Sequence, residues 1–449
     1  MKNISIFGTS SDAGKSTMTF VIAKILQDLG YSVAPFKAQN VSNNAHVCDD
    51  NSEIAIAQYF QASVLGVPTS YHLNPILLKS GRGSNASLIV EGQVVSEKNV
   101  LEYYRDLDTL KPAVKRCFEY LDMRYDCVVC EGAGSPVELN LMDKDLSNIF
   151  IADEYNTKII LIADIEKGGV FASIYGVYHL LPEKLRKNVI GVIVNKFRGD
   201  LSLFDEGISI IEKDFGIPVL GVLPYLPFNL GFEDSASLKN FVQDTSQKKL
   251  DIAVIHYPTM SNYNDFEPLI ADSEVSLEFV TSNISLERFD IVILPGSKLT
   301  INDLDWLKTT GLFAQLQQHK KPLFGICGGY EMMFEKLDDE EGLGLIDDVI
   351  EFQQEKVLHK GTYTLFGLEL EGFEIHHGIS KKYPLFFEMK GTFVHALFDN
   401  NDFRNKLFKT LNPDYQGFDF QTYKKVTIDN FIEEMKSRLD VQRIVKSVR

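Results

Sequence analysis

The sequence has no run of eighteen apolar residues, so it predicts no helix that spans a membrane. Cysteine is scarce and odd in number: the five cysteines are Cys48, Cys117, Cys127, Cys130 and Cys327. Thiols so few and so widely spread make no disulfide framework, which favours a reducing cytoplasm. Cys127 and Cys130 form one C-x-x-C without a second, and we interpret them as part of a buried strand rather than as a redox or metal pair.

Positive charge is also in deficit. The 45 Lys and Arg residues against 62 Asp and Glu give a formal net charge of −17, which argues against nucleic acid as a partner. The N-terminus runs directly into an apolar strand and a glycine-rich loop, so we expect no cleaved signal peptide. These features favour a cytoplasmic protein, and they leave its small-molecule substrates and its oligomeric state open.

The 449 residues are enough for two or three domains. In the first half, short apolar runs alternate with helical stretches. Continuous apolar runs are typical of parallel strands that helices cover on both faces. We therefore predict a doubly wound α/β domain. Its expected strands are residues 4–8, 33–37, 126–131, 158–164, 189–195 and 219–222.

The composition turns polar between about residues 230 and 250, where we place a domain boundary. The alternation then restarts and predicts a second α/β domain, with a helical, amphipathic tail over 401–449. The expected strands of this second domain are residues 252–256, 290–295 and 322–327. The predicted parts are an N-terminal domain over 1–232, a linker over 233–250 and a C-terminal domain over 251–449.

A glycine-rich loop, Gly8–Ser16, follows the first expected strand and opens a helix expected over 15–29. Glycines let backbone N–H groups crowd around a phosphate, the lysine adds charge for the β and γ phosphates, and the serine hydroxyl binds Mg²⁺. Five residues rather than four separate the glycines, which resembles the loop of dethiobiotin synthetase and its relatives. The predicted ATP-binding residues are Gly8, Thr9, Gly14, Lys15, Ser16 and Thr17.

Magnesium bound to a triphosphate also needs a carboxylate. Glu131, which ends an apolar run, is the best candidate to hold Mg²⁺ together with Ser16, and the alternative is a glutamate that caps a helix. Asp50 and Glu53 are weaker candidates for a second ligand.

A polar segment follows the second expected strand, at the edge where open α/β sheets bind ligands. It contains Lys37, Gln39, Asn40 and Asn44, which we predict to bind a substrate carboxylate. A polar surface loop is the alternative interpretation.

In the second half, Cys327 stands between a strand and the start of a helix. Such a turn is expected to expose the sulfur, and the helix N-terminus to lower the thiol pKa, so we predict that Cys327 is a nucleophile. Backbone N–H groups at Gly328 and in the loop at Gly296 are expected to form an oxyanion hole. A buried core cysteine is the alternative.

A thiolate that forms an acyl-enzyme needs a base, and nine histidines compete for this role. His395, which ends a β-rich run late in the second domain, is favoured. His376 and His377 remain alternatives.

Nine motifs occur in a fixed order along nearly the whole chain. They are Gly8–Ser16, Phe36–Asn44, Leu73–Lys79, Glu131–Pro136, Asp164–Phe171, Asn195–Asp200, Leu294–Lys298, Gly325–Tyr330 and Gly372–His376. Together they closely resemble the cobyric acid synthase family of glutamine-dependent amidotransferases. The resemblance implies an N-terminal domain similar to dethiobiotin synthetase and a C-terminal class I glutaminase.

The resemblance also implies ATP-dependent amidation of the b, d, e and g carboxylates of adenosylcobyrinic acid a,c-diamide, with Cys327 as nucleophile and His395 as its histidine. Most class I glutaminases carry a glutamate two residues after that histidine, where this chain has Leu397. The third member of the triad is therefore open, and glutaminase activity is expected to be slow unless the other site is occupied.

Three other interpretations remain. A cobyrinic acid a,c-diamide synthase would perform the same chemistry on other carboxylates, but that family carries a Gly-Pro-Asp-Tyr-type loop where this chain has Lys37. An amidotransferase acting on a peptidoglycan lipid usually divides its activities between two chains. A non-catalytic ATP switch of the partitioning type would hydrolyse ATP without glutamine turnover, and it leaves the Cys327 motif unexplained.

Overall fold

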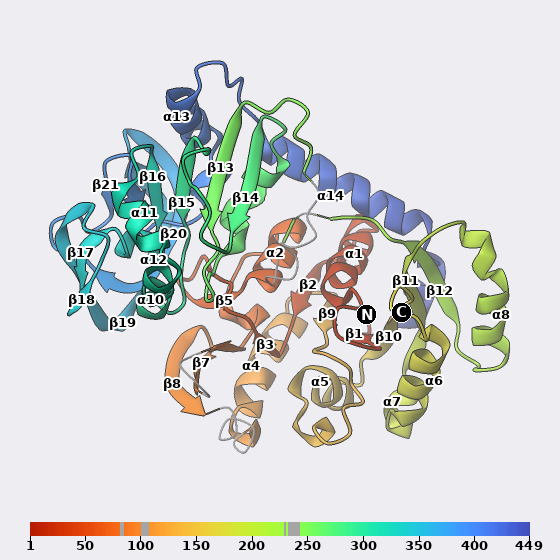
Figure 1. Cartoon of the computed structure of the whole chain (residues 1–449). Helices are drawn as coiled ribbons and strands as arrows, with labels where there is room; N and C mark the ends of the chain where they lie inside the picture. The colour runs from red at the N-terminus through yellow and green to blue at the C-terminus, as the bar shows by residue number, and fades with distance from the viewer. Residues whose placement is uncertain (81–84, 100–106, 229, 232–242) are drawn as a thin grey trace.

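The computed structural model describes residues 1–80, 85–99, 107–228, 230–231 and 243–449, which form two α/β lobes (Figure 1). The strands of the N-terminal sheet are β1 (Ile4–Gly8), β2 (Val33–Phe36), β9 (Cys127–Glu131), β10 (Lys158–Asp164), β11 (Val189–Phe197) and β12 (Val219–Pro224). They lie in the order β12-β11-β10-β1-β9-β2, and every pairing is parallel. The doubly wound sheet expected from the sequence is confirmed.

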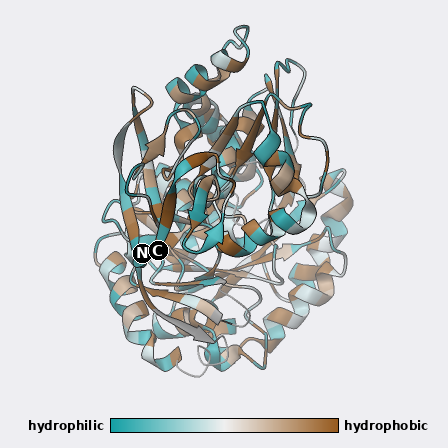
Figure 2. Ribbon diagram, turned by 60° about the vertical axis from the view of Figure 1, so that its left-hand side comes forward, coloured by the Kyte–Doolittle hydropathy of each residue, from teal (hydrophilic) through white to brown (hydrophobic). Residues whose placement is uncertain are grey.

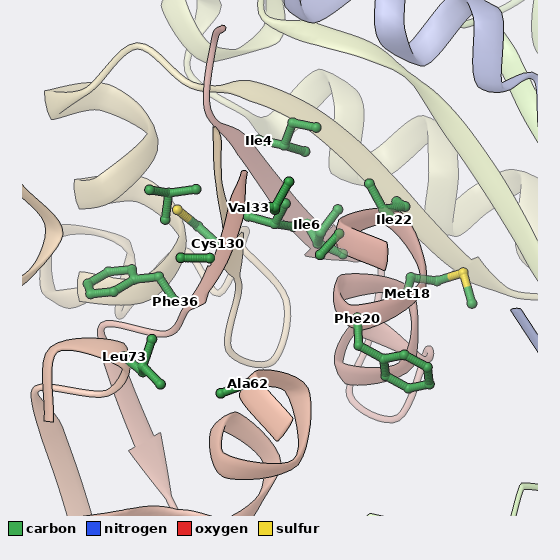
Figure 3. Packing of buried hydrophobic residues seen from close by; sticks show 14 of the residues in the cluster. Ile4, Ile6, Met18, Phe20, Ile22, Val33, Phe36, Ala62, Leu73 and Cys130 are labelled. Atoms are coloured by element: carbon green, nitrogen blue, oxygen red, sulfur yellow. The ribbon is translucent and has the colours of Figure 1, made fainter. Parts of the chain in front are cut away.

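Alternate apolar residues of β1, β10 and β11 enter different cores. Ile4 and Ile6 of β1 belong to one apolar cluster, where Met18 and Ile22 of the first helix lie near them (Figure 3), whereas Phe7 belongs to the cluster on the other face. The first face is covered by α1 (Lys15–Asp28), α2 (Ile56–Leu65) and α4 (Lys111–Asp122), and the second by α5 (Ile151–Glu154), α6 (Val170–Leu180), α7 (Glu183–Arg186) and α8 (Asp205–Lys213). Because both faces are apolar, the strands read as continuous apolar runs.

The hydropathy of the elements fits this layering. Figure 2 shows apolar colour concentrated on the strands inside the molecule, while the helices carry both colours. In the described part of the chain, none of the helices combines the length and apolarity needed to cross a bilayer. All five cysteines are free and buried, and Cys127 and Cys130 lie in β9, so the C-x-x-C belongs to a buried strand as expected. Burial raises the pKa of both thiols.

Between β2 and β9 the chain forms small sheets that were not among the expected strands. One contains β3 (Gln39–Val41), β6 (Ile76–Ser80), β7 (Asn85–Val90) and β8 (Gln93–Asn99), and the other contains β4 (Ala45–Val47) and β5 (Glu53–Ala55). These sheets face the C-terminal lobe in Figure 1.

The C-terminal lobe is a second α/β unit, as expected. Its main sheet has the order β14-β13-β15-β16-β22-β21, in which only β21 is antiparallel. The strands are β13 (Leu250–Ile255), β14 (Val275–Val280), β15 (Ile291–Leu294), β16 (Leu323–Ile326), β21 (Phe386–Phe387) and β22 (Gly391–Thr392). The helices are α9 (Glu267–Ala271), α10 (Thr300–Thr310), α11 (Leu312–Gln318), α12 (Gly328–Glu331) and α13 (Asn401–Leu411). A side sheet holds β17 (Phe334–Leu337), β18 (Glu340–Glu341), β19 (Ile346–Leu365) and β20 (Leu368–Ile379).

The last two helices, α14 (Phe420–Ser437) and α15 (Val441–Val448), return to the N-terminal lobe. Phe431 of α14 contacts Phe20 of α1 with 6.2 Å between ring centroids, and the Lys2 N–H donates to the Val448 carbonyl at 2.7 Å. Figures 1 and 2 accordingly show the two termini side by side. The helical tail is thus present: α13 packs in the C-terminal core, whereas the apolar sides of α14 and α15 pack in the N-terminal core, although the expected range 251–449 placed them with the C-terminal domain. Most of the expected linker, 233–242, lies outside the described residues.

A buried ion-pair cluster joins the two lobes. Glu53 of β5 has no exposed surface, and its carboxylate lies 2.8 Å from the Lys79 ammonium of β6 and 2.6 Å from the Lys356 ammonium of β19. The two lysines hold the pKa of Glu53 far below its usual range despite the opposing effect of burial. Glu53 therefore links the two lobes. The sequence made it a weaker candidate for a second magnesium ligand, but its carboxylate is already paired with two lysine ammonium groups.

Replacing Glu53 with glutamine is expected to lower the free energy of unfolding at pH 7 by about 3–5 kcal/mol, because two buried ammonium groups lose their counter-charge. The folded-state pKa is depressed, so the contribution of Glu53 is complete above its unfolded-state pKa of about 4.3 and is lost as the pH falls below it. Urea unfolding of both proteins at pH 7 and at lower pH should show the difference shrinking in acid.

A matched control is available on β19, the strand that carries Lys356. Glu351 pairs with Lys381 at the surface, so Glu351→Gln is expected to change the unfolding free energy by no more than about 0.5 kcal/mol. A Glu53→Gln protein as stable as the parent at pH 7 would contradict a structural role for the buried cluster.

Candidate active sites

The glycine-rich loop joins β1 to α1 and curls over the start of the helix. Gly14 has φ +101°, and a Cβ there would overlap the side-chain amide of Asn195. A Cβ on Gly8 would lie 2.8 Å from Lys15 Nζ, which folds back and donates to the Ser10 carbonyl at 3.1 Å. Both glycines are therefore required by space, and the lysine ammonium is held at the loop itself.

The remaining predicted ATP-binding residues extend the same structure. The Thr9 N–H donates to the Ile162 carbonyl of β10 at 2.8 Å, and Thr17 is half-buried in the first turn of α1. All six residues thus gather at the carboxyl edge of the sheet, at a helix N-terminus that attracts phosphate.

Glu131 ends β9 beside this loop and is 1% exposed. One carboxylate oxygen accepts from Ser16 Oγ at 2.8 Å and from Lys37 Nζ at 2.7 Å. The other accepts from Gln61 Nε2 at 2.6 Å and from Gln58 Nε2 at 3.2 Å. A carboxylate and a hydroxyl in contact are hard oxygen ligands, so Ser16 and Glu131 suit Mg²⁺ bound to a triphosphate.

The two glutamines of α2 were missed by the sequence analysis. Gln58 and Gln61 are three residues apart on one face of a mostly apolar helix, and both are buried. Buried amides at helical spacing need polar partners, which is the signal that could have directed attention to them.

The polar segment after β2 contains the predicted substrate residues. Lys37 forms an ion pair with Glu131, so its ammonium lies beside the candidate magnesium ligand. The Gln39 backbone exchanges hydrogen bonds with the Ser147 hydroxyl. Asn40 Nδ2 donates to Gln58 Oε1 at 3.0 Å. Lys37 and Asn40 therefore belong to one hydrogen-bonded network around Glu131.

Two further candidates lie elsewhere. Asn44 is buried, and its Oδ1 accepts from the Asn262 N–H of the C-terminal lobe at 2.6 Å. Asp50 lies in the turn between β4 and β5, where it accepts from the N–H and hydroxyl of Ser52. The structure thus joins Ser16 to Glu131, uses Asn44 in the contact between lobes, and holds Asp50 within its own turn.

Cys327 occupies the turn between β16 and α12 with φ +50° and ψ −113°, a strained conformation for a residue with a Cβ. The expected position is confirmed, but the expected exposure is wrong, because the side chain is only 5% exposed. Burial and the charge of Glu331 raise the thiol pKa well above its usual value, and the Gly328 N–H offsets this only in part. Desolvation thus outweighs the N-terminus of the short helix α12, and the thiol needs a base.

The two expected oxyanion loops converge beside Cys327. A Cβ on Gly328 would lie 2.8 Å from the Ser297 backbone nitrogen, and a Cβ on Gly296 would lie 2.9 Å from Cε1 of His395. Close backbone contact at both glycines brings the loop after β15 and the turn at Cys327 together. This is the arrangement that we expected for an oxyanion hole.

The geometry separates the candidate histidines. His376 has both ring nitrogens engaged, by Gly378 O at 2.8 Å and Glu374 Oε2 at 3.1 Å. His377 faces Gln353 O at 3.1 Å. In His395, Nδ1 lies 2.7 Å from Asp265 Oδ2, while Nε2 is buried and has no hydrogen-bond partner in the described part of the chain. Of the three candidates, His395 is the one whose ring a buried carboxylate orients at Nδ1 while its Nε2 is buried and unengaged in the described residues.

Cys327 and His395 line one cavity of about 600 Å³ at the junction of the lobes. Its wall includes Lys79 and Ser87 from the N-terminal lobe and Lys298 from the C-terminal lobe. A cavity of this size accommodates an amino acid, and Lys298 in its wall suits a carboxylate group.

The comparisons with known proteins agree with this geometry. Residues 4–229 match the model of the CobQ/CobB/MinD/ParA nucleotide binding domain, and residues 251–403 match that of the CobB/CobQ-like glutamine amidotransferase domain. The chain is 70% identical to "Cobyric acid synthase" of Acinetobacter baylyi, covering 100% of both chains. It is 35% identical to "Cobyric acid synthase" of Yersinia enterocolitica, covering 100% of this chain and 98% of that one. The chain belongs to the cobyric acid synthase family of glutamine amidotransferases.

Proposed function

We propose that the protein amidates the b, d, e and g carboxylates of adenosylcobyrinic acid a,c-diamide, with ATP as activator and glutamine as nitrogen source. The observation that supports the proposal is the presence in one chain of two candidate sites, a phosphate loop with Ser16 hydrogen-bonded to Glu131 and a cavity lined by Cys327 and His395. The full-length similarity to cobyric acid synthases supports this choice of substrate.

The N-terminal lobe activates the substrate acid. Activation is needed because a carboxylate is a poor electrophile, since hydroxide is a poor leaving group. The substrate carboxylate attacks the γ-phosphorus of ATP, giving an acyl phosphate and ADP, and ammonia then displaces phosphate to form the amide. Lys15 holds the β and γ phosphates. Ser16 and Glu131 would hold Mg²⁺, which neutralises phosphate charge during transfer. Lys37 and Asn40, in the network around Glu131, would orient the acid.

In the C-terminal lobe, His395 Nε2 takes the proton of the Cys327 thiol as the sulfur attacks the side-chain amide of glutamine. The Gly328 N–H and the loop at Gly296 stabilise the oxyanion. The amide nitrogen takes the proton from His395 and leaves as ammonia. Water then releases glutamate from the thioester and regenerates the thiol.

We also place this activity in the cytoplasm, with corrinoid acid, glutamine and ATP as its small-molecule partners. Five free, buried thiols suit a reducing compartment, and the net charge of −17 argues against a nucleic-acid partner.

Mass spectrometry of the corrinoid product tests this proposal. Purified protein with ATP, Mg²⁺, glutamine and the a,c-diamide should convert up to four carboxylates to amides. Omitting ATP, or omitting glutamine without adding ammonia, should prevent every conversion. No conversion of the a,c-diamide, together with amidation of cobyrinic acid at its a and c positions, would instead identify a diamide synthase.

A further inference from the structure

A buried carboxylate lies behind His395. Asp265 is 4% exposed and His395 1% exposed, and Asp265 Oδ2 lies 2.7 Å from His395 Nδ1. The second oxygen, Oδ1, accepts from the Ala396 N–H at 2.7 Å. Because both oxygens are used, the carboxylate is fixed in orientation and its partner nitrogen is fixed with it.

The imidazole ring is held from other sides as well. Phe373 stacks on it with 5.2 Å between centroids and 19° between planes, and Gly296 lies against its Cε1 edge. The nitrogen opposite Asp265, Nε2, is the buried one without a hydrogen-bond partner in the described residues, and His395 lines the same cavity as Cys327. One nitrogen is therefore anchored, and the other is left for the thiol.

We propose that Asp265 is the positioning residue of the glutaminase site, in the place that most class I glutaminases give to a glutamate two residues after the histidine. The inference rests on the proposed roles of Cys327 and His395. A carboxylate acceptor at Nδ1 keeps the proton there and leaves the Nε2 lone pair free for the thiol proton. It then stabilises the imidazolium until that proton passes to the departing ammonia.

The position expected to hold this group carries Leu397, which is 1% exposed and packs in the apolar core of the lobe. Asp265 comes from a different part of the chain, the short helix Tyr263–Phe266 that follows β13. β13, β15 and β16 are parallel neighbours, so the loops after them meet at one edge of the sheet. The carboxylate thus reaches the histidine from a segment 130 residues away in the sequence.

The loop that carries Asp265 is anchored by the N-terminal lobe. The Asn262 N–H donates to Asn44 Oδ1 at 2.6 Å, and Asn262 Nδ2 donates to the Ala45 carbonyl at 3.1 Å. The orientation of His395 therefore depends on how the two lobes meet. This gives Asn44 a role in positioning the glutaminase site.

Replacing Asp265 with asparagine tests the proposal in the full-length protein. Asparagine has one acceptor oxygen for two donors, the Ala396 N–H and the His395 Nδ1–H. If its oxygen serves Ala396, its NH₂ faces Nδ1 and forces the proton onto Nε2, which then accepts nothing from the thiol. Glutamine hydrolysis is expected to fall by a factor on the order of 10²–10⁴, with the loss in kcat rather than KM. Ammonia-supported amidation should be unchanged.

A second readout reports positioning directly. Alkylation of Cys327 by iodoacetamide becomes faster as the thiol ionises. In Asp265→Asn this increase should occur at a higher pH than in the parent protein, because the thiol must ionise without help from His395. Asp265→Glu retains the charge and should restore part of the hydrolysis rate. Asp272→Asn is the matched control, since Asp272 is also 1% exposed but accepts from the Tyr415 hydroxyl, and it should leave both readouts at parental values.

Each outcome decides the matter. Unchanged hydrolysis and an unchanged alkylation profile in Asp265→Asn would overturn the proposal. So would an equal loss of glutamine-supported and ammonia-supported amidation, because Asp265 would then be a structural residue of the lobe contact. Failure of Cys327→Ala to stop glutamine use would instead refute the role of Cys327 on which this inference rests, whereas no amidation of the a,c-diamide by the parent protein would refute the proposed function.

Discussion

Cys327→Ala is expected to abolish glutamine-supported amidation while amidation with added ammonia continues at the parental rate. The thiol is the group that attacks the glutamine amide, and removal of a nucleophile costs a factor on the order of 10⁴–10⁶ in rate. The acyl-phosphate chemistry takes place at Ser16 and Glu131 in the other lobe, with residues that do not include Cys327. Parallel assays with glutamine and with ammonium chloride, each followed by mass spectrometry of the corrinoid, measure the two activities in one preparation.

The buried state of the thiol makes this substitution informative. Burial and Glu331 raise the pKa of Cys327, so at neutral pH the free side chain is a thiol and depends on His395 for deprotonation. Alanine removes the sulfur without adding volume to the cavity wall. Cys117→Ala is the matched control, because Cys117 is also fully buried but lies in α4 of the other lobe, and it should keep full use of glutamine. Full glutamine use by Cys327→Ala would mean that another group is the nucleophile.

The sequence predicted the parts of the structure that depend on local pattern. Continuous apolar runs located the strands of the N-terminal sheet, because residues such as Ile6 and Phe7 each meet an apolar layer. The spacing of Gly8 and Gly14 located the phosphate loop, because both positions exclude a side chain. The need of Mg²⁺ for a carboxylate, together with the end of an apolar run, selected Glu131, which lies next to Ser16 although 115 residues separate them.

What the sequence left open depends on contacts between distant segments. Asp265 and His395 are 130 residues apart, and a search confined to the neighbourhood of His395 finds only Leu397. The burial of Cys327 likewise involves a distant strand, since its thiol donates to the Ile375 carbonyl of β20 at 3.7 Å. The carboxyl-edge rule that directed attention to Lys37 would also have selected Asp265, which follows β13 at the edge shared by the loops of Gly296 and Cys327.

Lys15→Ala is expected to stop amidation with either nitrogen source. Lys15 is 8% exposed, and its ammonium lies over Gly8 within hydrogen-bonding distance of the Ser10 carbonyl, inside the loop that would enclose the β and γ phosphates. Loss of one such charge in a partly desolvated site costs a factor on the order of 10²–10³ or more in rate. Without phosphorylation of the substrate acid, ammonia has no electrophile, so adding ammonium chloride cannot rescue this variant as it rescues Cys327→Ala.

The contrast between the two variants separates the two lobes. Lys15→Ala should bind an ATP analogue more weakly in calorimetry, yet hydrolyse glutamine in the absence of nucleotide at the parental rate, because its cavity at Cys327 and His395 is intact. Lys167→Ala is the matched control, since Lys167 also donates to the loop, at the Ser11 carbonyl, but its side chain is 54% exposed and so its charge is largely screened. Ammonia-supported amidation by Lys15→Ala at the parental rate would place ATP activation outside this loop and refute the assignment of the phosphate site.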